Sequence, residues 1–332
     1  MDNEQMNQDC NAEARKSIFD IIEEEIKASD LTDKAKEKKL AKLNKLREQK
    51  VNIMLTGSTG SGKSSTINAI FNMEVAKVGV GVDPETASMD SFELDNLTIW
   101  DTPGLGDGVE ADEKITETIL AKLAQKDEEG NPLIDMVIIV MDSSTKDLGT
   151  TYHLINDVLV PTLGDEAEER IIIALNQADI AMKGQHWDEA NNEPDEVLQA
   201  FLKDKAKSVR KRLLEGTGLD LKPVCYCAGY KEEGQEQRKP YNLTKLLYSI
   251  IKAIPKEKRL TVADNLNKDK ENWKHNDAEY NYSKDIFDHI EEGIEFGAEI
   301  GGKLVGIPGV IIGGAIGGAC GAIKGFLSFL FD

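Results

Sequence analysis

Nine consecutive residues combine the side chains and the backbone freedom needed to bind phosphate groups. They read Gly57-Ser58-Thr59-Gly60-Ser61-Gly62-Lys63-Ser64-Ser65 and keep the spacing G-x-x-x-x-G-K-[ST] of a phosphate-binding loop. Glycines let successive backbone N–H groups curl around phosphate oxygens. We expect the Lys63 ammonium to reach the outer phosphates and the Ser64 hydroxyl to ligate Mg²⁺. The pattern therefore predicts a site for a nucleoside triphosphate.

The residues on both sides of this loop have the patterns of a strand and of a helix. The apolar run 51–56 precedes the loop, and residues 66–71 continue it with helical spacing. A helix that begins near Lys63 would direct the positive end of its dipole toward the bound phosphates. The alternative, a chance glycine-rich turn, does not account for a strand pattern before the loop and a helix pattern after it.

Asp101 and Gly104 follow a second predicted strand, residues 97–100, within the segment Asp101-Thr102-Pro103-Gly104. A carboxylate at the end of that strand can hold Mg²⁺ through a water molecule. The backbone N–H of Gly104 can sense the terminal phosphate of the nucleotide. Both residues therefore predict contacts at the phosphate end of the site.

Asn176, Gln177 and Asp179 follow an apolar predicted strand and are suited to recognising the base. The Asp179 carboxylate can accept two hydrogen bonds, from the N1–H and the 2-amino group of guanine. Adenine has neither donor on that edge and would leave the acid unpaired. In the last predicted strand, residues 223–229, the backbone N–H of Ala228 is placed to meet the guanine carbonyl. These segments predict a preference for guanine nucleotides, and an ATPase is the weaker alternative.

In this order, the segments resemble the signature motifs of the small G proteins. Residues 56–71 are similar to the loop TG-x-GKSS-x-INA-[IL]-F of Era-like bacterial P-loop GTPases of the TRAFAC class. The resemblance covers residues 50–255 and implies a GTPase with GTP or GDP and Mg²⁺ as ligands. It implies catalytic roles for Lys63, Thr86 and Gly104. It assigns Ser64, Thr86 and Asp101 to Mg²⁺, and the following residues to the nucleotide: Gly57, Ser58, Thr59, Gly60, Ser61, Gly62, Lys63, Ser64, Ser65, Asn176, Gln177, Asp179 and Ala228.

Three positions depart from the usual motifs. Gln177 replaces the lysine whose stem lies along the base, so we expect weaker binding, with the guanine preference kept by Asp179. Thr86 is assigned by its position and by family likeness, and an ordinary loop threonine is the alternative. Leu105 stands where some G proteins carry a glutamine that positions the attacking water.

The side chain of Leu105 cannot orient a water molecule, and phosphoryl transfer depends mainly on positioning and on neutralisation of charge. We therefore expect slow intrinsic turnover. Acceleration would come from a partner, from a dimer contact across the nucleotide, or from assembly on a surface. Some relatives recruit potassium through an asparagine in the loop, and Gly60 at that place argues against this route.

Strand and helix patterns alternate across residues 50–255, which is typical of a parallel sheet with its ligand at the carboxyl ends of the strands. We expect an α/β fold of the P-loop GTPase type with a mostly parallel sheet. Further strands are predicted at 89–94, pairing with 97–100, and at 134–141, and helices at 112–126, 196–215 and 243–253. The helix over 196–215 is expected to pack through Val197, Phe201, Val209 and Leu213, and Asn242 to cap the helix after it.

The C-terminal segment, residues 293–332, has glycine at every fourth position through most of its length. Residues 304–323 contain no charge, close to the length of a bilayer-spanning helix, and glycine at this interval lets another backbone approach. We expect this glycine zipper to contact a lipid bilayer through residues 293–331, either peripherally or inserted. The alternative is a helical hairpin that packs on the N-terminal helices. Lys303 and Lys324 are the cations nearest the apolar run, too few to attract anionic lipid.

Both flanks of the predicted GTPase segment have helical patterns. Residues 1–49 are predicted to hold two helices, one with Ile18, Phe19, Ile22 and Ile26 on one side and one rich in lysine. Residues 256–292 form a charged helical segment, followed by the tail 293–332. We expect the flanks to form one helical domain beside 50–255, an architecture similar to that of dynamin-like and immunity-related GTPases.

Composition narrows the choice of partners and compartment. A length of 332 residues allows about two domains, and a net charge of −20 argues against nucleic acid as a partner. The four cysteines form no disulfide or zinc pattern, and the polar first residues are no signal peptide, so we expect a cytoplasmic protein. The first hypothesis is a GTPase switch or mechanochemical enzyme, alone or as a homodimer or oligomer, acting at a membrane. The second is a membrane-active or scaffold protein whose assembly is gated by nucleotide, with little turnover.

Overall fold

The computed structural model describes residues 17–71, 73, 77–79, 89–106, 108–229, 238–274, 276–277 and 280–298. Thr86 and most of the glycine-rich tail lie outside these residues, as do residues 1–16. Within the described residues, no helix is both long enough and apolar enough to cross a bilayer.

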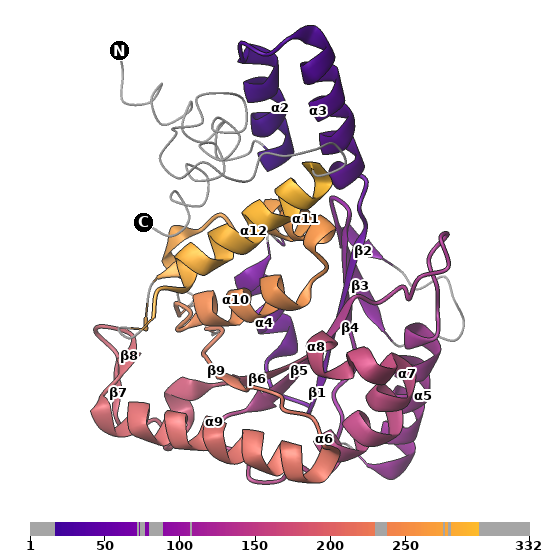
Figure 1. Ribbon diagram of the computed structural model, residues 1–332. Coiled ribbons are helices and arrows are strands. Elements are labelled where there is room, and N and C mark those ends of the chain that lie inside the picture. Colours follow the sequence, from indigo (N-terminus) through magenta and orange to yellow (C-terminus); the bar gives the residue numbers. More distant parts are fainter. Residues whose placement is uncertain are drawn as a thin grey trace.

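A seven-stranded sheet forms the centre of the fold (Figure 1). Five neighbouring strands run parallel, and β3 runs antiparallel between β2 and β4 at one edge. The predicted α/β fold with a mostly parallel sheet is thus confirmed. In spatial order the strands are β2 (Lys77–Gly79), β3 (Asp90–Leu94), β4 (Leu97–Asp101), β1 (Val51–Gly57), β5 (Met136–Asp142), β6 (Ile171–Asn176) and β9 (Val224–Cys225), and a separate small hairpin joins β7 (Trp187–Asp188) to β8 (Glu193–Pro194).

Helices cover both faces of this sheet. The longer ones are α2 (Ile18–Ala28), α3 (Asp33–Arg47), α4 (Lys63–Ile70), α5 (Val109–Leu123), α9 (Glu196–Thr217), α10 (Leu243–Ala253), α11 (Arg259–Asp264) and α12 (Tyr282–Ala298). The connection from β5 to β6 is a run of short turns: α6 (Gly149–His153), the π-helical η2 (Leu154–Leu159), α7 (Val160–Leu163), η3 (Gly164–Glu166) and α8 (Ala167–Arg170). Three further short turns are η4 (Ala178–Ile180), η5 (Lys256–Lys258) and η6 (Lys270–Trp273).

Two apolar clusters hold the helices to the sheet. One contains buried residues of α5, η2 and the end of α9, on one face. The other contains buried residues of α4 and α10 together with those of α2, α3, α11 and α12. The flanking helices therefore share their core with one face of the sheet. The division of the chain at residues 49, 255 and 292 stays a prediction.

Long-range contacts tie the two flanks to each other. The carboxylate of Asp264, at the end of α11, accepts hydrogen bonds from the Ile18 N–H at 2.6 Å and from the Ser17 hydroxyl at 2.8 Å. This carboxylate satisfies the Ile18 N–H, a backbone donor at the start of α2 that the helix itself leaves free, and the Ser17 hydroxyl accepts the next one, from Phe19, at 3.1 Å. At Gly293 of α12, an added Cβ would lie 2.2 Å from the Lys256 carbonyl oxygen of η5. The first glycine of the predicted zipper therefore serves a close contact inside the molecule.

Two local predictions were wrong. In α9, Val197 and Phe201 are exposed, and Leu198 and Leu202 are the buried residues of that part of the helix. Two apolar stripes with four-residue spacing, Val197/Phe201 and Leu198/Leu202, run side by side there, and the helix packs through Leu198 and Leu202. Asn242 precedes α10, but its side chain accepts no hydrogen bond from the helix; its amide donates to the Cys225 carbonyl at 2.8 Å.

Candidate functional site

The phosphate-binding loop connects the end of β1 to α4, at the carboxyl edge of the parallel strands. Gly57, Gly60 and Gly62 all have positive φ, which favours glycine. An added Cβ would lie 2.0 Å from the Val140 carbonyl oxygen at Gly57 and 2.3 Å from the Asn176 amide nitrogen at Gly62. The glycines therefore allow both the turn of the loop and the close approach of its neighbours.

Lys63 begins α4, and its side chain is buried against the loop. Its ammonium lies 3.3 Å from the Gly57 carbonyl oxygen and 3.2 Å from that of Ser58. The loop thus holds a cation at the positive end of a helix dipole, where an anion is favoured. This arrangement agrees with the predicted contact between Lys63 and the outer phosphates.

Ser64 and Asp101 meet beside the loop, as the sequence predicted for a metal site. The Ser64 hydroxyl donates to Oδ2 of Asp101 at 2.8 Å. The other carboxylate oxygen, Oδ1, is buried and has no hydrogen-bond partner among the described residues. Burial raises the pKa of Asp101, while the Ser64 hydrogen bond and the Lys63 charge lower it. A buried oxygen without a partner, next to a hydroxyl, fits a hard, oxygen-preferring cation such as Mg²⁺.

The segment after β4 closes against the phosphate loop. The Leu105 N–H donates to the Gly57 carbonyl, and the Thr59 N–H donates to the Leu105 carbonyl, both at 3.0 Å. An added Cβ at Gly104 would lie 2.6 Å from the Thr59 nitrogen, so only glycine fits there. The side chain of Leu105 is 3 % exposed and belongs to the apolar cluster under α5. It therefore lies in the core and does not face the nucleotide position.

The predicted base-recognition residues reach the phosphate loop directly. The Asn176 side-chain amide donates to the Ser61 carbonyl, and the Gln177 amide donates to the Gly60 carbonyl, both at 2.9 Å. Asp179 is buried in η4, close to β9. Figure 1 shows β1, β6 and β9 within the same sheet, whose carboxyl ends carry these residues.

Ala228 has a contact that the sequence did not reveal. Its N–H donates to the Asn176 side-chain oxygen at 2.9 Å, so this donor has a partner within the protein. A guanine carbonyl would have to share that N–H or displace Asn176 from it. The role of Ala228 in base recognition stays a prediction.

The sequence also missed the residue that holds α4 to β9. The hydroxyl of Tyr226 lies 2.6 Å from that of Thr66, which itself donates to the Gly62 carbonyl at 2.8 Å. Tyr226 is fully buried, and burial raises its pKa. Its place in an apolar strand pattern gave no signal of this role. In the described residues, no group of three or more His, Cys, Asp or Glu side chains is arranged to bind a metal ion.

The structure thus brings Lys63, Ser64, Asp101 and Gly104 together around the loop and links Asn176 and Gln177 to it. The remaining predicted residues of the loop, Gly57 to Ser65, lie between β1 and the first turn of α4. Thr86 lies outside the described residues, so its predicted place at the metal is untested.

One curated protein is similar to part of this chain. The curated uncharacterised protein YfjP of Escherichia coli K12 is 28 % identical over 151 residues, which cover 44 % of this chain and 47 % of that protein. The match therefore spans about half the length of the curated relative.

Among solved structures, Toc33 from Arabidopsis thaliana with Mg²⁺ and GMPPNP is 18 % identical, with a TM-score of 0.38. That match covers 63 % of this chain and 86 % of Toc33. A probable GTP-binding protein, EngB, is 17 % identical with a TM-score of 0.38, covering 61 % of this chain and 98 % of EngB. The model of the AIG1 family matches residues 51–215, the part of the chain that holds the phosphate loop, Asp101 and Asp179.

Proposed function

We propose that this chain binds GTP with Mg²⁺ and hydrolyses GTP to GDP and phosphate. The observation that carries the proposal is the pair of hydrogen bonds from Asn176 and Gln177 to the carbonyls of Ser61 and Gly60. These bonds join the predicted base-recognition residues to the phosphate loop, so that one nucleotide can span both. The AIG1 match over residues 51–215 supports the same conclusion.

In this proposal each residue has a separate task. The loop N–H groups and the Lys63 ammonium bind the phosphates, and the Gly104 N–H contacts the terminal one. Ser64 and Asp101 hold Mg²⁺, with Thr86 as the further ligand that family likeness assigns. Bound Mg²⁺ neutralises charge that develops on the phosphate oxygens. The Asp179 carboxylate selects guanine by accepting hydrogen bonds from the N1–H and the 2-amino group of the base.

Intrinsic hydrolysis should be slow, because the Leu105 side chain is in the core and no residue yet assigned orients the attacking water. We propose that a partner, a second copy of the chain or a surface supplies this function. Hydrolysis that is fast at low protein concentration and independent of that concentration would contradict this part of the proposal.

Substitution of Asp179 by asparagine tests the choice of base. An asparagine side chain offers a donor where guanine also has a donor, whereas xanthine has an oxygen at that position. We expect Asp179→Asn to weaken GTP binding at least tenfold, the equivalent of about 1.4 kcal/mol, and to favour xanthosine triphosphate. Calorimetry with both nucleotides and Mg²⁺ measures the change. Wild-type protein that releases no heat with GTP would refute the nucleotide site itself.

We further propose that the chain acts at a membrane, from the cytoplasm, through its C-terminal tail. The uncharged run 304–323 supports this proposal. The contact of Gly293 with η5 changes the expected start of the lipid-binding segment from residue 293 to the residues after Ala298. Flotation with vesicles should therefore compare the full chain with one that ends at Ala298. A cut near residue 285 would also remove Ile286, Phe287 and Ile290 from the core.

Single-turnover hydrolysis with and without vesicles separates the two functional hypotheses. A GTPase that works at a membrane should cleave GTP faster when vesicles are present. A scaffold gated by nucleotide should bind vesicles in a nucleotide-dependent way while its turnover stays low.

A further inference from the structure

Helix α3 is one of two strongly basic segments of this acidic protein. Residues 33–50, which contain α3, carry eight Lys or Arg and three Asp or Glu, a net charge of +5. The whole chain carries −20, which leaves −25 for all other residues. Residues 203–212 of α9 also carry +5, from six Lys or Arg and one Asp, so α3 differs from α9 in its position in the fold and not in the sign of its charge.

Four lysines of α3 lie on one side of the helix. Lys34, Lys38, Lys42 and Lys45 are spaced by four, four and three residues, and Leu43 on the opposite side is buried. We call these four residues the lysine face. Lys34, Lys38 and Lys45 are exposed, and none of the three forms an ion pair with a carboxylate among the described residues.

The lysines of this face repel one another. Partial burial lowers the pKa of Lys42, and the charge of Lys38, one helical turn away, lowers it further. Like charges at this spacing destabilise a helix. An external anionic surface would relieve this repulsion.

Two acidic residues of the neighbouring helix α2 pair with cations outside the lysine face. Asp20 and Glu23 pair with Arg47, at 2.7 and 3.5 Å, and Glu23 also pairs with Lys27. Arg47 is on the inner side of α3, away from the lysine face. These carboxylates thus bind α2 to α3 and leave the outer side of α3 basic.

Helix α3, which carries the lysine face, contacts the helix from which the apolar tail continues. Helix α12 contacts α3 and ends at Ala298, and 34 further residues follow. Figure 1 shows α12 reaching the base of the α2–α3 hairpin, at the end of the molecule away from α9. Glu292, near this end of α12, already pairs with Arg259 at 3.1 Å and with Lys256 at 3.7 Å.

We propose that the lysine face of α3 docks on an anionic lipid bilayer. The inference rests on the proposed action at a membrane and supplies the basic cluster that the tail sequence lacks. Stable attachment generally needs two weak signals, for example an apolar segment and a polybasic patch. Here α3 carries one signal, and the tail that carries the other continues the chain from α12, which contacts α3. The lysine face gives the protein its preference for anionic lipid, and the tail gives affinity for any bilayer.

The test uses the full chain and the double variant Lys38→Gln/Lys45→Gln. Each lysine near an anionic surface contributes about 1 kcal/mol, or about fivefold in binding. We therefore expect the variant to bind vesicles of phosphatidylcholine and phosphatidylserine about 25-fold more weakly and pure phosphatidylcholine vesicles unchanged. Added salt screens the same charges and should also weaken binding of the wild type to the anionic vesicles.

The matched control is Lys207→Gln/Lys211→Gln on exposed positions of α9, with the same change in net charge. It should bind both kinds of vesicle like the wild type, and thermal melting should show that both variants fold. Equal binding of the wild type to neutral and anionic vesicles would refute docking by the lysine face, while the proposal of action at a membrane would stand. The absence of binding to any vesicle would refute the membrane proposal itself. Salt-sensitive self-association without lipid, lost in Lys38→Gln/Lys45→Gln, would assign the face to a second copy.

Discussion

Leu105 contributes to the site through its backbone, while its side chain belongs to the core. Its N–H and carbonyl connect the segment after β4 to Gly57 and Thr59 of the phosphate loop. Its side chain packs in the cluster that also contains Met54 and Ile119. The position therefore sets where Gly104 lies relative to the phosphate loop.

A glutamine at this position should destabilise the fold without speeding hydrolysis. Leu105→Gln would bury an amide among apolar side chains, at a cost of about 1–3 kcal/mol. We expect a lower denaturant midpoint and unchanged single-turnover hydrolysis. Leu105→Met, which keeps an apolar side chain of similar volume, is the control and should lose less stability. A faster single turnover for Leu105→Gln would show that the side chain can reach the attacking water.

The positions of the candidate site residues in the fold were largely predictable from the sequence, and the contacts between segments were not. Motif spacing and the flanking strand patterns placed Lys63 and Ser64 after β1 and Asp179 after β6, as the structure has them, and their roles stay predictions. Nothing in the sequence predicted that the Gln177 amide would bind the Gly60 carbonyl or that the Ala228 N–H would bind Asn176. Such contacts depend on how strand ends from distant parts of the chain are aligned in the sheet.

At the scale of elements, a half-buried lysine lies near the junction of α2 and α11. Lys268 donates to the Asp264 carbonyl at 2.9 Å, and burial lowers the pKa of Lys268 to about 8. The Asp264 carboxylate, which caps α2, has a pKa raised by burial and lowered by its bonds to Ile18 and Ser17. The charge of Lys268 is therefore disfavoured in the folded state.

This shift predicts how stability changes at alkaline pH. Between about pH 8 and 10.5 the unfolded chain binds a proton at Lys268 that the folded chain lacks, so stability should rise with pH there. The free energy of unfolding should rise by at most about 3 kcal/mol over this range, since one pKa unit is about 1.4 kcal/mol. Lys268→Met removes the titrating group and should flatten this part of the curve. Parallel curves for wild type and Lys268→Met, from denaturation at several pH values, would show that the pKa is not lowered.

The elements themselves followed from sequence patterns, but their orientation did not. The boundaries of β1, β6 and α10 are close to those predicted from apolar runs and turn residues. Helix α9 has two possible apolar stripes, and only packing against the loop after β6 decides that Leu198 and Leu202 face inward. Likewise, Asp264 gave no sign that it would cap a helix at the other end of the chain.

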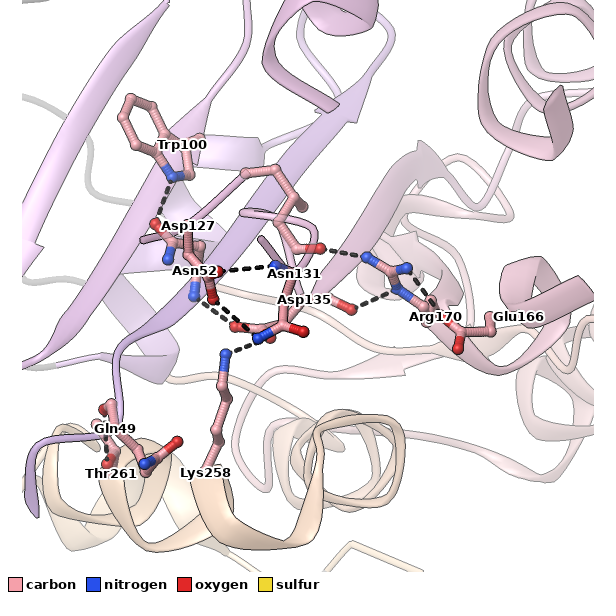
Figure 2. A network of polar contacts seen from close by, with 11 residues as sticks. Gln49, Asn52, Trp100, Asp127, Asn131, Asp135, Glu166, Arg170, Lys258 and Thr261 are labelled. Carbon is pink, nitrogen blue, oxygen red and sulfur yellow. Dashed lines mark hydrogen bonds and ion pairs between the residues drawn. The ribbon is translucent and has the colours of Figure 1, made fainter. Parts of the chain in front are cut away.

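At the scale of the whole molecule, a polar network joins the central sheet to the C-terminal flank (Figure 2). The Asp135 carboxylate accepts the Asn52 N–H at 2.8 Å and the Lys258 ammonium at 2.7 Å. The Asn52 side chain accepts the indole N–H of Trp100 at 3.0 Å, and the Arg170 guanidinium donates to the Asp135 carbonyl at 2.9 Å. Burial raises the pKa of Asp135, and Lys258 opposes this.

Removing one charge of the Asp135–Lys258 pair should destabilise the fold more than removing both charges. Lys258→Met leaves a buried carboxylate without its cation and should cost about 3 kcal/mol or more. The double variant Asp135→Asn/Lys258→Met removes both charges, and we expect it to recover part of that loss. A double-mutant cycle from urea unfolding measures the coupling. Strictly additive effects would mean that the pair does not hold the flank to the sheet.

The cap on α2 also determines when the N-terminal hairpin can mature during synthesis. Residues Ser17 and Ile18 leave the ribosome early, yet the carboxylate that binds them is 246 residues further along the chain. Translation proceeds at about 5–20 residues per second, so the start of α2 waits tens of seconds for Asp264. A ribosome-bound nascent chain that stops before residue 264 should therefore expose Ile18, Phe19 and Ile22 to chaperones.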